Sequence, residues 1–136
     1  MTPQQVIGQK GEELAQAYLK DQGYAIKETN WKFSHAEIDI IAEKNGVLVF
    51  VEVKTKTYTY YGAPEESIDA KKERLICDAA AGYMVKNSYE WEFRFDIISI
   101  LLKKDSYELE HFEDAFFPGI WDALMLTEKT PVTVFQ

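Results

Sequence analysis

The chain has 136 residues, of which 46% are hydrophobic and 28% charged, and this size and composition fit one domain with its own core. A single cysteine, Cys77, excludes an intramolecular disulfide framework, and without a long apolar run or a secretory signal we expect a cytoplasmic protein with no membrane partner. The formal net charge of −8 disfavours nucleic-acid binding, but most of this excess lies from Asp105 onward.

The first predicted element is a helix that begins after Thr2 and ends before Gly23. Thr2 and Gln5 have the spacing of a capping box, and Pro3 suits the first helical position. Gly23 is typical of the residue that follows a helix C-terminus. Glu12, near the middle, is a candidate active-site carboxylate if its side of the helix meets the rest of the site. A solvated helix acid is the alternative.

A short strand over residues 24–31 leads into residues 36–54, which have the pattern of a β-hairpin. Asn45-Gly46 is a strong signal for a type I′ turn, because both residues tolerate a positive φ. The flanking segments are rich in Ile, Val and Phe, which favour strands. The second strand is apolar on both faces, and this predicts a sheet that is covered on both sides.

The two-residue turn predicts the register of this hairpin. Asp39 would lie opposite Glu52, and Glu37 would lie opposite Lys54. Opposed residues share a face, so three acids and one lysine would converge. Two carboxylates at the end of a buried strand repel each other, and a divalent cation such as Mg²⁺ between them would reverse that interaction. The alternative is a solvated polar rim on an amphipathic hairpin.

Residues 55–66 are interpreted as a strand end and a loop, in which Lys56 could contact phosphates; ordinary packing is the alternative. A second helix is predicted from about Asp69 to Asn87. Its first turns carry three cations that oppose the helix dipole, so either a phosphate contact or a solvated face would explain them. These cations are Lys71, Lys72 and Arg74.

A core strand is predicted over residues 91–101, and an edge strand with one solvated face over residues 107–112. His35 and His111 lack the spacing of a zinc site and are interpreted as surface or loop histidines. The acidic, aromatic segment 113–126 is interpreted either as a docking segment or as a short helix packed on the domain.

Several short motifs follow one another along the chain: Gly11-Glu12, Glu37-Ile38-Asp39, Phe50-Val51-Glu52-Val53-Lys54, Lys71, Arg94-Phe95-Asp96 and Asp114-Ala115-Phe116. In this order they resemble the YraN-like proteins, a bacterial family similar to Holliday-junction resolvases. The resemblance covers about residues 4–117. It departs at Ala36, where the family usually has Gly, and at Lys56, where the family often has Arg.

The resemblance implies a restriction-endonuclease-like α/β domain over residues 1–117, with a mixed central sheet flanked by helices. Residues 118–136 lie outside the resemblance and are expected to form a C-terminal extension that is packed on the domain or trails from it. The resemblance also implies that Asp39 and Glu52 hold Mg²⁺ or Mn²⁺, and that Lys54 activates or orients the attacking water. Glu12 matches the first-helix acid of resolvase-like members.

The resulting hypothesis is a metal-dependent DNA endonuclease, with branched DNA as a candidate substrate. One alternative is a non-catalytic nucleic-acid- or protein-binding module on the same fold, and another is a nuclease subunit that needs a homodimer or a partner chain. The catalytic candidates are Asp39, Glu52, Lys54, Glu12 and Glu37; the metal candidates are Asp39, Glu52 and Val53; and the DNA-contacting candidates are Lys56, Lys71, Lys72 and Arg74.

Overall fold

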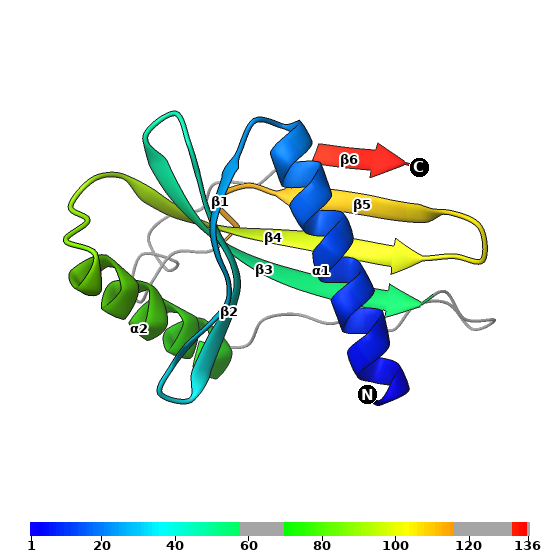
Figure 1. Ribbon diagram of the computed structural model, residues 1–136, viewed down its shortest axis with the longest axis horizontal. Coiled ribbons are helices and arrows are strands. Elements are labelled where there is room, and N and C mark those ends of the chain that lie inside the picture. The colour runs from blue at the N-terminus through cyan, green and yellow to red at the C-terminus, as the bar shows by residue number, and fades with distance from the viewer. Residues whose placement is uncertain (58–69, 116–131, 136) are drawn as a thin grey trace.

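The computed structural model describes residues 1–57, 70–115 and 132–135, which form two helices and one six-stranded sheet (Figure 1). The strands lie side by side in chain order, and β3 and β4 are parallel whereas the other neighbours are antiparallel. This mixed α/β arrangement is consistent with the predicted restriction-endonuclease-like fold. The elements are α1 (Pro3–Asp21), β1 (Ala25–Phe33), β2 (Ala36–Lys44), β3 (Val47–Thr57), α2 (Ala70–Lys86), β4 (Phe93–Leu102), β5 (Tyr107–Phe112) and β6 (Val132–Phe135).

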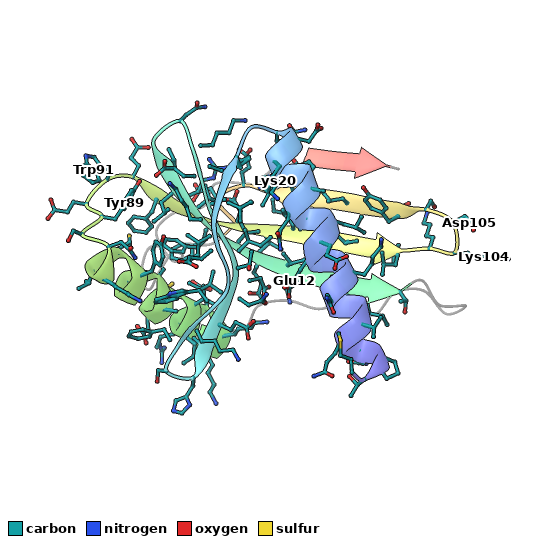
Figure 2. All side chains as sticks on the ribbon, viewed as in Figure 1. Glu12, Lys20, Tyr89, Trp91, Lys104 and Asp105 are labelled. Carbon is teal, nitrogen blue, oxygen red and sulfur yellow. The ribbon has the colours of Figure 1, made fainter. Side chains whose placement is uncertain are left out.

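Helix α1 begins and ends where its capping residues predict. The Thr2 side chain accepts a hydrogen bond from the Gln5 N–H, and the Gln5 side chain accepts one from the Thr2 N–H. Gly23 follows the helix with a φ of 92°, a conformation that glycine adopts without strain. Lys20 lies in the last turn, where a cation interacts favourably with the helix dipole (Figure 2).

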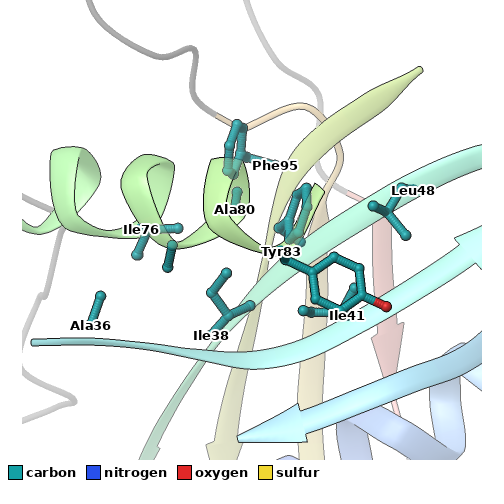
Figure 3. Packing of buried hydrophobic residues seen from close by; sticks show 10 residues of the cluster. Ala36, Ile38, Ile41, Leu48, Ile76, Ala80, Tyr83 and Phe95 are labelled. Carbon is teal, nitrogen blue, oxygen red and sulfur yellow. The ribbon is translucent and has the colours of Figure 1, made fainter. Parts of the chain in front are cut away.

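The two helices cover opposite faces of the sheet. Val49 and Val51 of β3 pack in a buried cluster with Ala15 and Leu19 of α1. The alternate strand positions Leu48 and Phe50 belong to a second cluster, which includes residues of α2 (Figure 3). Because successive strand residues point to opposite faces, these two clusters lie on the two sides of one sheet. The prediction that β3 is covered on both sides is therefore confirmed.

Helix α2 stands between β3 and β4 in the chain, as the crossover between parallel strands requires. Ile76, Ala80 and Tyr83 form its buried side and face Ile38 of β2 (Figure 3). The rest of the predicted loop after Thr57 and the predicted cap Asp69 lie outside the described residues. Across the described chain, neither helix combines the length and apolarity that a membrane span requires.

The turn between β2 and β3 has the predicted conformation. Asn45 and Gly46 have φ values of 52° and 77°, and both positive angles are those of a type I′ turn. Lys44 pairs with Val47, and the ladder continues in the predicted register to Ile40 and Val51.

The regular alternation of β2 breaks at Asp39. Ile40 packs in the cluster under α1, whereas Ile38 packs in the cluster under α2, although a regular strand would place them on one face. The described β2–β3 ladder ends at Ile40, so the direct pairing of Asp39 with Glu52 was wrong in detail. The pairing of Glu37 with Lys54 was also wrong, because the described ladder ends before Glu37, which is exposed.

Two predictions about β5 were wrong. It is not an edge strand, because β6 pairs with it antiparallel, for example Leu109 with Val134. His111 is not a surface residue, since its exposed fraction is only 1%. His35 is exposed in the turn between β1 and β2, as predicted. The boundary expected between residues 117 and 118, and most of the segment 113–126, lie outside the described residues.

Candidate active site

Asp39 lies where β2 leaves the regular ladder with β3. Its Oδ2 atom accepts a hydrogen bond of 2.8 Å from the main-chain N–H of Val53. Burial, together with the negative charge of Glu52, raises the pKa of Asp39 to about 8. The structure therefore brings Asp39 beside Glu52, as the sequence predicts, although a break in β2 and not a regular ladder pair produces the approach.

Glu52 belongs to the sheet face that α2 covers and is 7% exposed. Its Oε1 atom lies 2.6 Å from the ammonium nitrogen of Lys72, in the first turn of α2. A buried carboxylate is costly unless it is paired, and Lys72 supplies that pairing. The predicted phosphate-contacting lysine is thus bound to the predicted metal ligand.

Glu12 reaches the same region from α1. The preceding Gly11 is buried, and a Cβ atom there would overlap the Thr55 side chain, so glycine permits close approach of α1 to β3. Burial raises the pKa of Glu12, and the charges of Glu37 and Glu52 raise it further, against a hydrogen bond from Asn30 that lowers it. Glu12 therefore contributes to the electrostatics of the Asp39 and Glu52 carboxylates.

The remaining predicted cations lie around these carboxylates at different exposures. Lys54 and Lys56 follow Glu52 at alternate positions of β3, so they belong to its face of the sheet, and both are half-buried. Lys71 and Arg74 of α2 are exposed. Lys72, of the same predicted set, forms an ion pair with Glu52.

The oxygen atoms at this position suit a hard divalent cation. Asp39 and Glu52 supply carboxylates, and Mg²⁺ commonly binds one or two carboxylates together with water and phosphate oxygens. The Val53 N–H points toward Asp39, and because the N–H and C=O of one strand residue point the same way, its carbonyl faces that side as well. Among the described residues, no three His, Cys, Asp or Glu side chains form a metal-binding group. An ion here would therefore need main-chain, water or substrate oxygens.

Asn30 is a site residue that the sequence analysis missed. It has a φ of 51°, and it stands between the paired residues Thr29 and Trp31, opposite the break at Asp39. Its side chain donates a hydrogen bond to Glu12. Asparagine is unfavourable in strands and tolerates positive φ, so its presence within the predicted strand was the available signal of an irregular position.

A second polar cluster, also missed, surrounds the buried Asp96. Its Oδ2 atom lies 2.7 Å from Nε2 of His111, and Arg94 donates to both carboxylate oxygens at 2.9 and 3.1 Å. The Tyr18 hydroxyl lies 3.0 Å from the other ring nitrogen of His111, and Arg94 donates to the Tyr24 hydroxyl. Burial would raise the pKa of Asp96, but the hydrogen bonds from His111, Arg94 and the main chain outweigh it and lower the pKa.

Comparison with known proteins identifies relatives over most of the chain. The family described as Uncharacterised protein family UPF0102 matches residues 11–100. A UPF0102 protein of Flavobacterium psychrophilum is 43% identical over 111 residues, which cover 82% of this chain and 93% of the relative. One from Phocaeicola vulgatus is 43% identical over 115 residues (85% and 95%), and one from Bacteroides fragilis is 36% identical over 121 residues (89% and 100%).

Proposed function

The chain belongs to the uncharacterised protein family UPF0102, as its likeness to the YraN-like proteins predicts, and we propose that it is a metal-dependent DNA endonuclease. The observation that carries this proposal is the approach of Asp39 to Glu52 in a largely buried position. Burial and mutual repulsion disfavour two ionised carboxylates there, and a divalent cation would remove the conflict.

In this proposal Asp39 and Glu52 hold Mg²⁺ or Mn²⁺, with the carbonyl of Val53 as a further ligand. The metal would polarise the scissile phosphate and lower the pKa of a bound water. Lys54 stands two positions after Glu52 on the same strand face, and its charge would stabilise negative charge that develops on the phosphate. Glu12 would orient water from the α1 side.

DNA is the substrate class that fits the surrounding cations. Four predicted phosphate contacts come from two elements that meet at Glu52: Lys56 from β3, and Lys71, Lys72 and Arg74 from the start of α2. Cations in the first turn of a helix oppose its dipole, so a bound phosphate would compensate them. The resemblance suggests branched DNA as the substrate. The test must therefore compare cleavage of branched DNA with cleavage of unbranched DNA.

The test is cleavage of labelled DNA junctions, flaps, duplexes and single strands with Mg²⁺ or Mn²⁺. We expect wild type to cut at least one structure, and we expect Asp39→Asn and Lys54→Ala to reduce the rate by at least about a hundredfold. Lys20→Ala, a charge removal at the exposed far end of α1, is the matched control and should retain activity. Cleavage that survives both site substitutions would exclude this site.

A non-catalytic binding module on the same fold is the second candidate. It is favoured by the absence of a three-residue His, Cys, Asp or Glu metal group within the described chain, and by the net charge of −8. Calorimetry with Mg²⁺ distinguishes the two functions. A module without a working site would show no metal binding that depends on Asp39 and Glu52.

A further inference from the structure

Lys72 extends the sheet-facing side of α2 by one helical turn. Ile76 and Ala80 on this side are buried, and residues four positions apart share a helix face. Lys72 precedes Ile76 by four positions, so the helix directs its stem toward the sheet. Its ammonium nitrogen then lies 2.6 Å from Oε1 of Glu52. Lys71, one position earlier, is exposed on another side of the same turn.

The two side chains of this ion pair differ in exposure and in conformational freedom. The Glu52 side chain is 8% exposed and is fixed within β3, whereas the Lys72 side chain is 48% exposed. A lysine carries its charge on a flexible stem with three rotatable donors, so the ammonium can leave without movement of α2. Glu52 stays in place and can accept a different cation.

We propose that Lys72 competes directly with the divalent cation for Glu52, and that metal binding releases Lys72 to contact a DNA phosphate. This inference rests on the proposed function, because it assigns the metal to Glu52 and the phosphate to DNA. Lys72 compensates the buried carboxylate while no metal is bound. Once a metal neutralises Glu52, the attraction that holds the ammonium of Lys72 at this carboxylate is lost.

The exchange links two binding events. A metal ion at Glu52 breaks the ion pair that competes with DNA for Lys72, and DNA that binds Lys72 removes the competitor of the metal. Each ligand therefore strengthens the other by the same factor, as thermodynamic linkage requires. Lys72 therefore lowers the metal affinity of the free protein, and DNA that binds Lys72 removes this competition.

The experiment is calorimetric titration of the intact chain with MgCl₂ and MnCl₂ in the absence of DNA. Lys72→Met removes the competing charge and keeps an unbranched stem, so we expect the metal to bind about three- to tenfold more tightly than to wild type. Lys71→Met removes the same charge from the same turn and should change the affinity much less. Lys72→Arg keeps a cation at this position and should stay close to wild type.

The outcomes separate this inference from the proposed function. If wild type binds metal and Lys72→Met binds it no more tightly than Lys71→Met does, competition by Lys72 is excluded while the nuclease proposal stands. If neither wild type nor Lys72→Met binds either metal, both proposals fail. A junction DNA added before the titration should raise the metal affinity of wild type more than that of Lys72→Met, and an equal increase would also overturn the linkage.

Discussion

At the scale of single residues, Asp39 should make the stability of the metal-free protein depend on pH. Its pKa is raised to about 8, so the folded state keeps a proton that the unfolded state releases above about pH 4. The free energy of unfolding should therefore fall as the pH rises from about 4 to about 8. Bound Mg²⁺ should restore stability at the upper end of this range.

Asp39→Asn tests this dependence, because an amide carries no charge at any pH in the range. At pH 8 without metal, we expect the substitution to raise the melting temperature by about 3–8 °C. At pH 4 the two proteins should melt within a degree or so of each other, since Asp39 is protonated there. Circular dichroism in EDTA measures both, and an increase of the same size at the two pH values would contradict the assignment.

Asn30 should control the ionisation of Glu12. Asn30→Gly accepts the φ of 51° but removes the amide that donates to Glu12, so the pKa of Glu12 should rise with little loss of stability. Asn30→Ala removes the same donor and adds backbone strain of about 1 kcal/mol. NMR titration of the Glu12 carboxyl carbon and urea unfolding separate the two effects. An unshifted Glu12 titration in Asn30→Gly would contradict the hydrogen bond.

The residues of the site were predictable to different degrees. The Asn45-Gly46 turn was sufficient to predict the β2–β3 register as far as Ile40 and Val51, because a two-residue turn sets the register of both strands. The break at Asp39 was not predicted, since residues 36–44 read as one regular strand in the sequence. His111 shares its strand face with Leu109, so the alternation of β5 itself pointed to burial, and the surface interpretation overlooked it.

At the scale of elements, the approach of α1 to β3 depends on Gly11. A Cβ atom there would overlap Thr55, so Gly11→Ala should force α1 away from the sheet and displace Glu12. We expect a loss of about 1–3 kcal/mol of stability, as overpacking usually causes. Urea unfolding measures this loss, and metal titration should show weaker binding.

Gly8→Ala is the matched control for this substitution, one turn earlier on the same helix. A Cβ atom on Gly8 meets no described atom within 4 Å, so only helix propensity should change. Alanine is favoured over glycine by up to about 1 kcal/mol inside a helix, and Gly8→Ala should be neutral or stabilising. Equal destabilisation by the two substitutions would contradict a specific contact at Gly11.

Both helices and strands β1 to β5 were predicted within a few residues of their observed bounds, whereas β6 was not predicted. Capping residues mark both ends of α1, and Asn45-Gly46 marks the hairpin, because these signals act on neighbouring backbone. Strand β6 has no capping residue or turn signal of this kind beside it among the described residues. Its four residues join the sheet through pairing with β5, a contact between distant segments that no local pattern encodes.

At the scale of the whole molecule, the Asp96 cluster joins segments from both halves of the chain. Asp96 in β4 contacts His111 in β5 and the main chain of Asp114, and Arg94 extends the network to Tyr24 before β1. The pKa of Asp96 is lowered, so its contribution to stability is present above about pH 4 and is lost as the pH falls further.

Asp96→Asn should therefore cost about 3–5 kcal/mol at pH 7, because Arg94 and His111 lose their buried anionic partner. The difference from wild type should shrink as the pH falls below about 4, where the wild-type carboxyl takes up a proton. Urea unfolding between pH 3 and pH 7 measures it. A difference that is independent of pH would show that the ionised form of Asp96 is not what stabilises the fold.

The parallel pairing of β3 with β4 affects the order in which the strands pair during folding. The β2–β3 hairpin is closed by a two-residue turn and can form in microseconds, whereas Leu48 of β3 must find Phe93 far along the chain. The two strands that carry Asp39 and Glu52 therefore pair early, before α2 delivers the ammonium of Lys72. Until α2 packs, these two acids lack the compensating charge of Lys72, and dissolved divalent ions should therefore speed refolding.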